Sequence, residues 1–375
     1  MKNKTMRALL GIGLVMIFGA SGLASKMGGD ATTAPVIPQL TPVSTFSDST
    51  VPANGDVNPY GVAFVPRGFP SGGPLTPGDI IVSNFNNSAN LQGTGTTIVR
   101  VNNNAAPTLF FQGQQPLGLT TALGVLKGGF VLVGNLPSLD GSGSCIAESG
   151  PNQNVGQGGL LVLDKNGNLL TTFTDASLLN GPWDLTLHDM GTSAQVFVAN
   201  ALSGTVTRLD LVVSQSGVTI GKATQIASGY VHRCDPAAFV VGPTGVVLDR
   251  ENDTLYVSST GDNAIFAVKD ASTRTTDAGT GNVFIEDPAH LHGPLGLVLA
   301  SNGDLISTQG DIIHPRKNRP SEVVEFSPEG KFVDQFSVDP VFGSAFGIAL
   351  RNLDGGFVFS TVDDNTAVLD IWNVQ

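Results

Sequence analysis

The sequence has little positive charge, and it lacks the local motifs of several enzyme classes. It contains 19 Lys and Arg against 31 Asp and Glu, a net charge of −12. Such a surface repels phosphate backbones, so the charge balance excludes nucleic acid as a partner. A Gly-x-Ser-x-Gly elbow, a His-Glu-x-x-His pair and a phosphate-binding glycine-rich loop are all absent. Nucleophilic serine catalysis therefore has no local support.

Long apolar runs are also scarce, and the longest is at the start of the chain. Residues 1–24 begin with three basic residues, continue through the apolar run Ala8–Phe18 and end on small residues around Ala24. The run is shorter than the roughly 20 residues of a membrane span, and this order is typical of a signal peptide. We expect a secreted or periplasmic protein with no transmembrane segment after cleavage near Ser25. The alternative is a retained single-span anchor.

Helical periodicity is almost absent, and a short pattern recurs in its place. The pattern is proline, any residue, glycine and an aliphatic residue, and its copies are about 50 to 65 residues apart. Short apolar strands and turns rich in Gly, Asn and Asp lie between the copies. Units of this length fit a four-stranded blade, so the sequence predicts an all-β, six-bladed β-propeller over residues 42–375. The units start near Pro59, Pro116, Pro182, Pro243, Pro294 and Ala345.

The sixth unit ends without a fourth strand. The N-terminal segment Val43–Ser47 resembles Leu170–Thr174, the fourth strand of the second unit. We therefore predict that the N-terminal strand pairs with the last blade and closes the ring, which removes exposed sheet edges. Residues 25–41, rich in Thr, Pro and Gly, are expected to form a linker.

One stretch carries a family resemblance. Asp253–Ile265 resembles the core of the NHL repeat, and Val196–Val206 and Phe357–Val368 are weaker copies. The chain is similar to propellers of the NHL or SMP-30-like kind, which include lyases, lactonases and binding modules. The resemblance thus implies the fold, and it leaves the activity open.

Four of the five histidines fall on loops of one predicted face. Imidazole is a common zinc ligand, and channel-mouth histidines hold a metal in the peptidyl-α-hydroxyglycine lyases of this fold class. By that resemblance, the candidate ligands are His232, His290, His292 and His314, and the candidate catalytic residues are Arg233, Arg316 and Tyr230. The competing interpretation is that these loop histidines are simply solvated.

A second candidate metal site is lined by oxygen atoms. Asn84, Asn135 and Asn200 end the second strands of the first three units, and Asp262 follows the second strand of the fourth. Calcium prefers several such oxygens. The SMP-30-like lactonases use a Glu, an Asn and an Asp at their channel, whereas the first unit here lacks that Glu. The alternative is that these side chains cap turns.

The chain has only two cysteines, Cys145 and Cys234, and both fall on the predicted face of the histidines. Export permits a disulfide between them, and two free thiols are the alternative. We expect a monomeric binding module that holds a small molecule or a protein through loops 135–159, 227–242 and 309–320. A metal-dependent lyase or hydrolase at the same channel mouth, with zinc or calcium, is the alternative.

Overall fold

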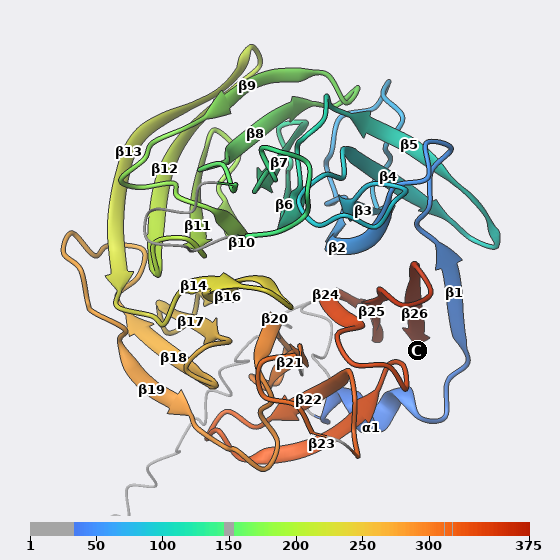
Figure 1. The fold of residues 1–375 in the computed structure, drawn as a ribbon, viewed down its shortest axis with the longest axis vertical. Coiled ribbons are helices and arrows are strands. Elements are labelled where there is room, and N and C mark those ends of the chain that lie inside the picture. The colour runs from blue at the N-terminus through green and yellow to red at the C-terminus, as the bar shows by residue number, and fades with distance from the viewer. Residues whose placement is uncertain (1–33, 146–153, 311, 317) are drawn as a thin grey trace, which may run out of the picture.

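The computed structural model describes residues 34–145, 154–310, 312–316 and 318–375. These residues form six four-stranded antiparallel sheets around a central axis, together with one two-stranded hairpin (Figure 1). The predicted six-bladed propeller is confirmed. The proposed signal peptide, residues 1–24, lies outside the described ranges. No helix within them is long and apolar enough to cross a membrane.

The strands of each blade run from the axis outward in chain order. Blade one holds β2 (Val57–Phe64), β3 (Ile80–Asn86), β4 (Thr97–Asn102) and β5 (Ala105–Gln112). Blade two holds β6 (Leu119–Leu126), β7 (Phe130–Asn135), β8 (Gly159–Asp164) and β9 (Leu169–Phe173). Blade three holds β10 (Pro182–Asp189), β11 (Ser193–Asn200), β12 (Thr205–Ser214) and β13 (Gly217–Ser228). Blade four holds β16 (Pro243–Asp249), β17 (Thr254–Ser259), β18 (Ala264–Lys269) and β19 (Asn282–Ile285). Blade five holds β20 (Pro294–Leu299), β21 (Leu305–Gln309), β22 (Glu322–Phe326) and β23 (Phe332–Ser337).

Blade six combines the two ends of the propeller. From the axis outward it holds β24 (Ala345–Leu353), β25 (Gly356–Asp363) and β26 (Val368–Val374), and its outermost strand is β1 (Thr45–Ser49). Strand β1 runs antiparallel to β26, with Phe46 opposite Ile371 (Figure 1). The predicted closure is therefore confirmed. Apolar side chains fill the space between neighbouring blades, as where Leu132 of β7 and Val196 of β11 share one cluster.

Part of the expected linker packs against the ring. Residues 36–40 form the short helix α1 (Val36–Leu40), which lies beside β23 and β26 (Figure 1). The buried carboxylate of Glu325 in β22 accepts hydrogen bonds from the backbone N–H groups of Val36 and Ile37, at 2.6 and 2.7 Å. Burial raises the pKa of Glu325 to about 7, and the bonds from Val36 and Ile37 lower it in part. The last residues of the 25–41 segment thus belong to the packed structure.

The repeated glycines bring the inner strands together at the axis. A Cβ on Gly347 would collide with the carbonyl oxygen of Tyr60 in the next blade, and one on Gly296 would lie 2.5 Å from that of Phe346. A register shift directly follows the start of each inner strand, as between Pro59 and Val62. These bulges allow the inner strands to turn toward the axis without losing their outer pairing.

The copy of the pattern at Pro116 is displaced from the inner strand of blade two. Strand β6 starts at Leu119. Gly61 of blade one faces the carbonyl oxygen of Thr120, and the hydroxyl of Thr121 donates to the carbonyl oxygen of Trp183 in blade three. Thr120 and Thr121 therefore occupy in blade two the positions that Tyr60 and Gly61 occupy in blade one.

Cys145 and Cys234 form a disulfide, as one of the two sequence interpretations had it. Cys234 lies in β14 (Arg233–Asp235), which pairs with β15 (Phe239–Val241) in a short hairpin. Buried Phe239 anchors this hairpin through an edge contact with Phe85, with ring centroids 5.8 Å apart. The bridge thus links the loop after β7 to the loop that enters blade four.

Candidate functional site

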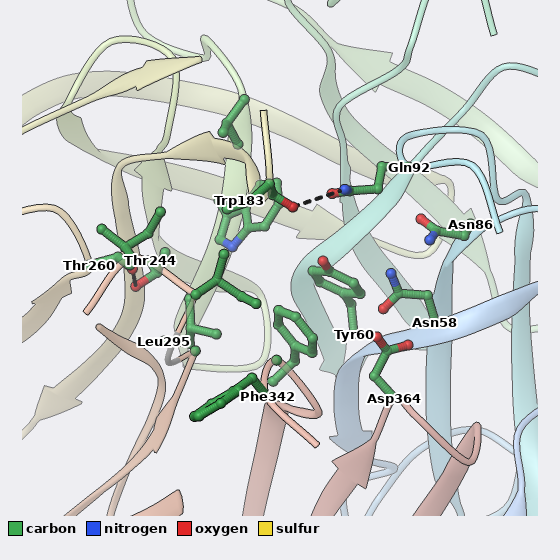
Figure 2. A pocket seen from close by; sticks show the side chains of 18 of the residues that line it. Asn58, Tyr60, Asn86, Gln92, Trp183, Thr244, Thr260, Leu295, Phe342 and Asp364 are labelled. Atoms are coloured by element: carbon green, nitrogen blue, oxygen red, sulfur yellow. Dashed lines mark hydrogen bonds between the residues drawn. The ribbon is translucent and has the colours of Figure 1, made fainter. Parts of the chain in front are cut away.

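A cavity of about 240 Å³ lies at the mouth of the central channel, where the inner strands begin (Figure 2). Three of its four described aromatic side chains come from the variable position of the repeated pattern: Tyr60, Trp183 and Phe346. Tyr60 stacks on Phe346 with centroids 4.3 Å apart and meets Trp183 edge-on at 5.7 Å. These rings give the cavity a rigid aromatic side.

Amide side chains from blade one form a second wall. Asn58 precedes the bulge of β2, Asn86 ends β3, and Asn90 and Gln92 follow in the next loop. The Nδ2 of Asn86 donates to Asn90 Oδ1 at 2.6 Å. Asn58 and Asn86 are 5% and 2% exposed, and the Oδ1 atom of each lacks a hydrogen-bond partner within the described structure. A buried acceptor without a partner costs about 1–3 kcal/mol, so this wall has unused acceptor capacity.

The carboxyl group in this cavity belongs to Asp364, which lies beside Asn58 and below Tyr60 (Figure 2). Burial, and then the charge of the neighbouring Asp363, raises the pKa of Asp364 to about 7. Burial and the nearby Asp364 also raise the pKa of Tyr60 far above its ordinary value. Among the described lining residues, Asp364 is the only carboxylate, and none is Lys, Arg or His.

The opposite wall combines hydroxyl groups with apolar side chains. Thr244 and Thr260 both donate to the carbonyl oxygen of Pro294, at 3.0 and 2.9 Å. The apolar side chains of this wall include Leu295, Ile312, Ile313 and Phe342. The β14–β15 hairpin adds Ala237, Ala238 and Val240, and Gln92 donates to the carbonyl oxygen of Ala237 at 3.4 Å (Figure 2).

The predicted histidine ligands engage separate partners. His290 Nδ1 lies 2.7 Å from Asp287 Oδ2 and its ring stacks on Phe332, whereas buried His292 Nδ1 lies 2.9 Å from Glu322 Oε2. Exposed His232 contacts the carbonyl oxygen of Tyr230, and His314 Nε2 is buried without a partner among the described residues. No group of three or more His, Cys, Asp or Glu side chains in the described ranges is placed to hold a metal. The donors around these histidines do not fit the expected zinc centre.

The three candidate catalytic residues are likewise dispersed. Arg233 is exposed and pairs with Asp235 at 3.5 Å. Arg316 donates to the carbonyl oxygen of Ala289. Tyr230 is buried and donates to the carbonyl oxygen of Thr280 at 3.0 Å, and burial raises its pKa. None of the three lines the cavity at the channel mouth.

The candidate ligands of the oxygen-lined site form hydrogen bonds within one loop or between neighbouring loops. Asp262 bonds within its own turn, as the turn-capping alternative expects, whereas the three asparagines bond to separate loops. Asn84 Nδ2 donates to the carbonyl oxygen of Thr50, Asn135 Nδ2 to that of Leu117 and Asn200 Nδ2 to that of Leu178, and Asp262 accepts from the N–H of Val231 and the hydroxyl of Ser259. None of these four lines the cavity.

Sequence reasoning missed the residues that do line the cavity. The repeated pattern includes the positions of Tyr60, Trp183 and Phe346, but by itself it predicts only the number of blades. Aromatic residues at three copies of one variable position were an available signal. The predicted loops contribute in part: 227–242 supplies Ala237, Ala238 and Val240, and 309–320 supplies Gly310, Ile312 and Ile313.

The fold and this cavity define the protein as a six-bladed β-propeller with a small-molecule-sized cavity at its channel mouth. No protein-family model matches the chain, and no curated protein does. Solved structures do match. A structure described as a candidate gluconolactonase is 14% identical, with 92% of this chain and 97% of that chain covered and a TM-score of 0.53. A gluconolactonase from Xanthomonas campestris is 14% identical, with 86% and 88% covered and a TM-score of 0.51.

A protein of unknown function from Bacteroides thetaiotaomicron also matches, at 10% identity over 88% of this chain and 76% of that chain, with a TM-score of 0.52. At these identities the shared property is the fold, a six-bladed propeller.

Proposed function

We propose that the protein binds an uncharged small molecule, with one flat apolar face and several hydroxyl groups, in the cavity at the channel mouth. A cyclic polyol or a sugar has this chemistry. The observation that carries the proposal is the pairing of an aromatic side, formed by Tyr60, Trp183 and Phe346, with a wall of uncharged amides. Ligand cavities usually combine apolar walls with a few convergent polar groups.

The amide wall supports a ligand that donates hydrogen bonds. Asn58 and Asn86 both carry a buried side-chain oxygen without a partner. Hydroxyl groups of a ligand supply donors, and each satisfied buried acceptor recovers part of about 1–3 kcal/mol. A volume of about 240 Å³ is small against the roughly 300–1,000 Å³ of drug-sized sites, which favours a single ring over an extended chain.

The ligand proposal can be tested through tryptophan fluorescence. The chain has two tryptophans, and Trp183 lines the cavity, whereas Trp372 lies in β26. In a Trp372→Phe background, titration with D-glucose and with myo-inositol should change the Trp183 emission in a saturable way. Glucose 6-phosphate should bind at least tenfold more weakly, because the described lining of the cavity offers a carboxyl and no cation.

A matched pair of variants assigns the signal to the cavity. Asn86→Ala should weaken binding at least tenfold, and Asn168→Ala, in the exposed turn after β8, should leave it unchanged. A folded protein whose Trp183 emission responds to none of these uncharged compounds would overturn the proposal.

Hydrolysis of such a ligand is the second candidate function, and the carboxyl of Asp364 favours it. A group with a pKa of about 7 can accept a proton at neutral pH and return it. In this scheme Asp364 removes a proton from a water that attacks a lactone carbonyl. The new C–O bond forms as the ring C–O bond breaks, and the proton passes to the leaving alkoxide. Two of the similar structures are described as gluconolactonases or candidates, which supports this reaction class.

Hydrolysis of D-glucono-δ-lactone in a pH-stat tests this candidate. The expected result is a rate that rises with pH around 7 and falls at least a hundredfold in Asp364→Asn. Equal hydrolysis rates in the wild type and Asp364→Asn would contradict the hydrolase candidate. Ligand binding would then be the remaining proposed function. We also propose that the protein acts as a monomer outside the reducing cytoplasm, and the Cys145–Cys234 bridge supports the compartment.

A further inference from the structure

The central channel holds a second cavity, of about 330 Å³, farther along the inner strands. All six inner strands contribute to its lining, as their central position around the axis suggests (Figure 1). Its members follow the residues of the mouth cavity along the same strands, as Phe64 follows Tyr60 in β2. This second cavity, the inner channel, therefore lies toward the opposite face of the ring.

The walls of the inner channel are mostly aliphatic. Two threonines, Thr121 and Thr186, supply hydroxyl groups, and most other positions are Val, Leu, Ile, Ala or Gly. Asp184 is the only ionisable residue among the described ones that line it. It stands in blade three where four other blades carry the glycine of the repeated pattern.

The carboxylate of Asp184 is held at the channel wall by backbone donors. Its Oδ1 accepts from the N–H of Leu185 at 2.8 Å, and its Oδ2 accepts from the N–H of Val246 in the next blade at 3.3 Å. Each oxygen therefore keeps a lone pair for a further donor. Burial raises the pKa of Asp184 well above its ordinary value, and these two bonds offset only part of that effect.

We propose that the inner channel is a second binding site, for a small organic cation in which a primary ammonium group carries a short hydrocarbon chain. The ammonium group offers three donors and a positive charge to Asp184, and the chain packs against the aliphatic walls. Burial of the hydrocarbon chain favours binding, and the charge complement selects cations over alcohols.

Other ligand classes fit the inner channel poorly. Calcium takes six to eight oxygen ligands, and here one carboxylate and two hydroxyls are available. An anion would meet a carboxylate, and no cation is among the described residues that line the channel. Arg351, next to Leu350 of the lining, places its guanidinium 4.8 Å from the Phe64 ring and donates to the carbonyl oxygen of Gly78.

The proton balance of binding is defined by Asp184. While its carboxyl is neutral, an ammonium ion can pair with it only after the carboxyl proton leaves to solvent. The ligand keeps its own proton, because alkyl ammonium groups have a pKa of about 10. Binding of the cation therefore releases up to one proton per site, and affinity should rise with pH until Asp184 is ionised in the free protein.

Isothermal titration with n-butylammonium chloride, and with 1-butanol as the uncharged match, tests this site. The expected result is one site per chain for the cation, at least tenfold weaker binding of the alcohol, and a binding heat that changes with the ionisation enthalpy of the buffer. Failure of n-butylammonium to bind the folded protein, or equal affinity for 1-butanol, would overturn the proposal.

Three variants locate the site. Asp184→Asn should weaken n-butylammonium binding at least tenfold and remove proton release, and Asp364→Asn, at the mouth, should change neither. Ala349→Leu adds volume at the lining of the inner channel and keeps the carboxyl, and it should also weaken binding. If Asp184→Asn fails to fold, the Ala349→Leu result and the wild-type buffer dependence still decide. Loss of n-butylammonium binding in Asp364→Asn, but not in Asp184→Asn, would show that the cation binds in the mouth cavity. That result would refute the proposal.

Discussion

The two cavities of the central channel are built by the same inner strands, yet their chemistry differs. The mouth cavity combines aromatic rings, amides and Asp364, and the inner channel is mostly aliphatic with Asp184 as the one ionisable residue of its described lining. Loops and the β14–β15 hairpin contribute to the first, whereas inner-strand residues line the second. Variety in a propeller therefore enters through its loops, because the strands must preserve the packing of neighbouring blades.

Replacing both Cys145 and Cys234 with serine should have the largest effect on stability and should separate the two cavities. The cysteines are 89 residues apart in sequence, and the loop-entropy model assigns such a bridge roughly 4–5 kcal/mol. Sugar binding at the mouth should weaken because the hairpin that carries Val240 is released, and n-butylammonium binding should persist. Urea unfolding and the two titrations measure this. Equal losses at both cavities would show that they are not independent.

Gly347→Val should disturb the boundary between the cavities. A side chain there collides with the backbone of Tyr60, where blade six meets blade one. Overpacking at this position should lower the free energy of unfolding by about 3 kcal/mol, and both binding reactions should weaken. Gly221→Ala in β13 is the control, since the nearest atom to its added Cβ is 3.3 Å away. A Gly347→Val protein as stable as the control contradicts the close approach.

Glu325→Ala should loosen the helix α1 and leave both cavities intact. Two backbone N–H groups lose their shared acceptor, which should lower stability by about 2 kcal/mol and speed proteolysis before Thr45. Limited proteolysis followed by mass spectrometry of the fragments detects the change. A shift in either binding constant would mean that the docking of α1 is coupled to the channel.

Among these variants, Asp364→Asn should change the free energy of unfolding least, and the sign of that change with pH is informative. The pKa of Asp364 is about 7 in the folded protein and lower when unfolded, so ionisation favours the unfolded chain between pH 4 and 7. Wild-type stability should therefore fall over that range relative to the variant, by about 1–2 kcal/mol after allowance for solvent screening. Thermal melts from pH 4 to pH 8 measure the difference. A gap that narrows as pH rises would contradict the raised pKa.

The fold was predictable because it repeats. The recurring pattern marks bulged inner strands in most blades, and similarity between Val43–Ser47 and an outer strand predicted the closure. The copy at Pro116 misled because sequence spacing alone does not show that β6 begins at Leu119. The helix α1 was missed because five residues are too few to show a helical period, and its partner Glu325 is 288 residues away from Ile37.

The site was less predictable, since residue type says little about the partners of a side chain. His292 is a residue type that binds zinc, but among the described residues no third His, Cys, Asp or Glu side chain joins His292 and Glu322, which lies 2.9 Å from its Nδ1. Asn86 and Asp364 lie 278 positions apart in the printed sequence and meet only because the ring closes. The departure from glycine at Asp184 was visible in the sequence, and its burial in an apolar channel was not.

The pairing of β1 with β26 has a consequence for biosynthesis. The ribosome makes β1 before the other strands and β26 after them, so blade six cannot assemble until translation of the propeller is finished. During that interval β1 waits with an unpaired edge, and the growing arc of blades carries an open flank. Such edges template aggregation, so we expect a nascent or exported chain to depend on holdase chaperones until the final strand arrives.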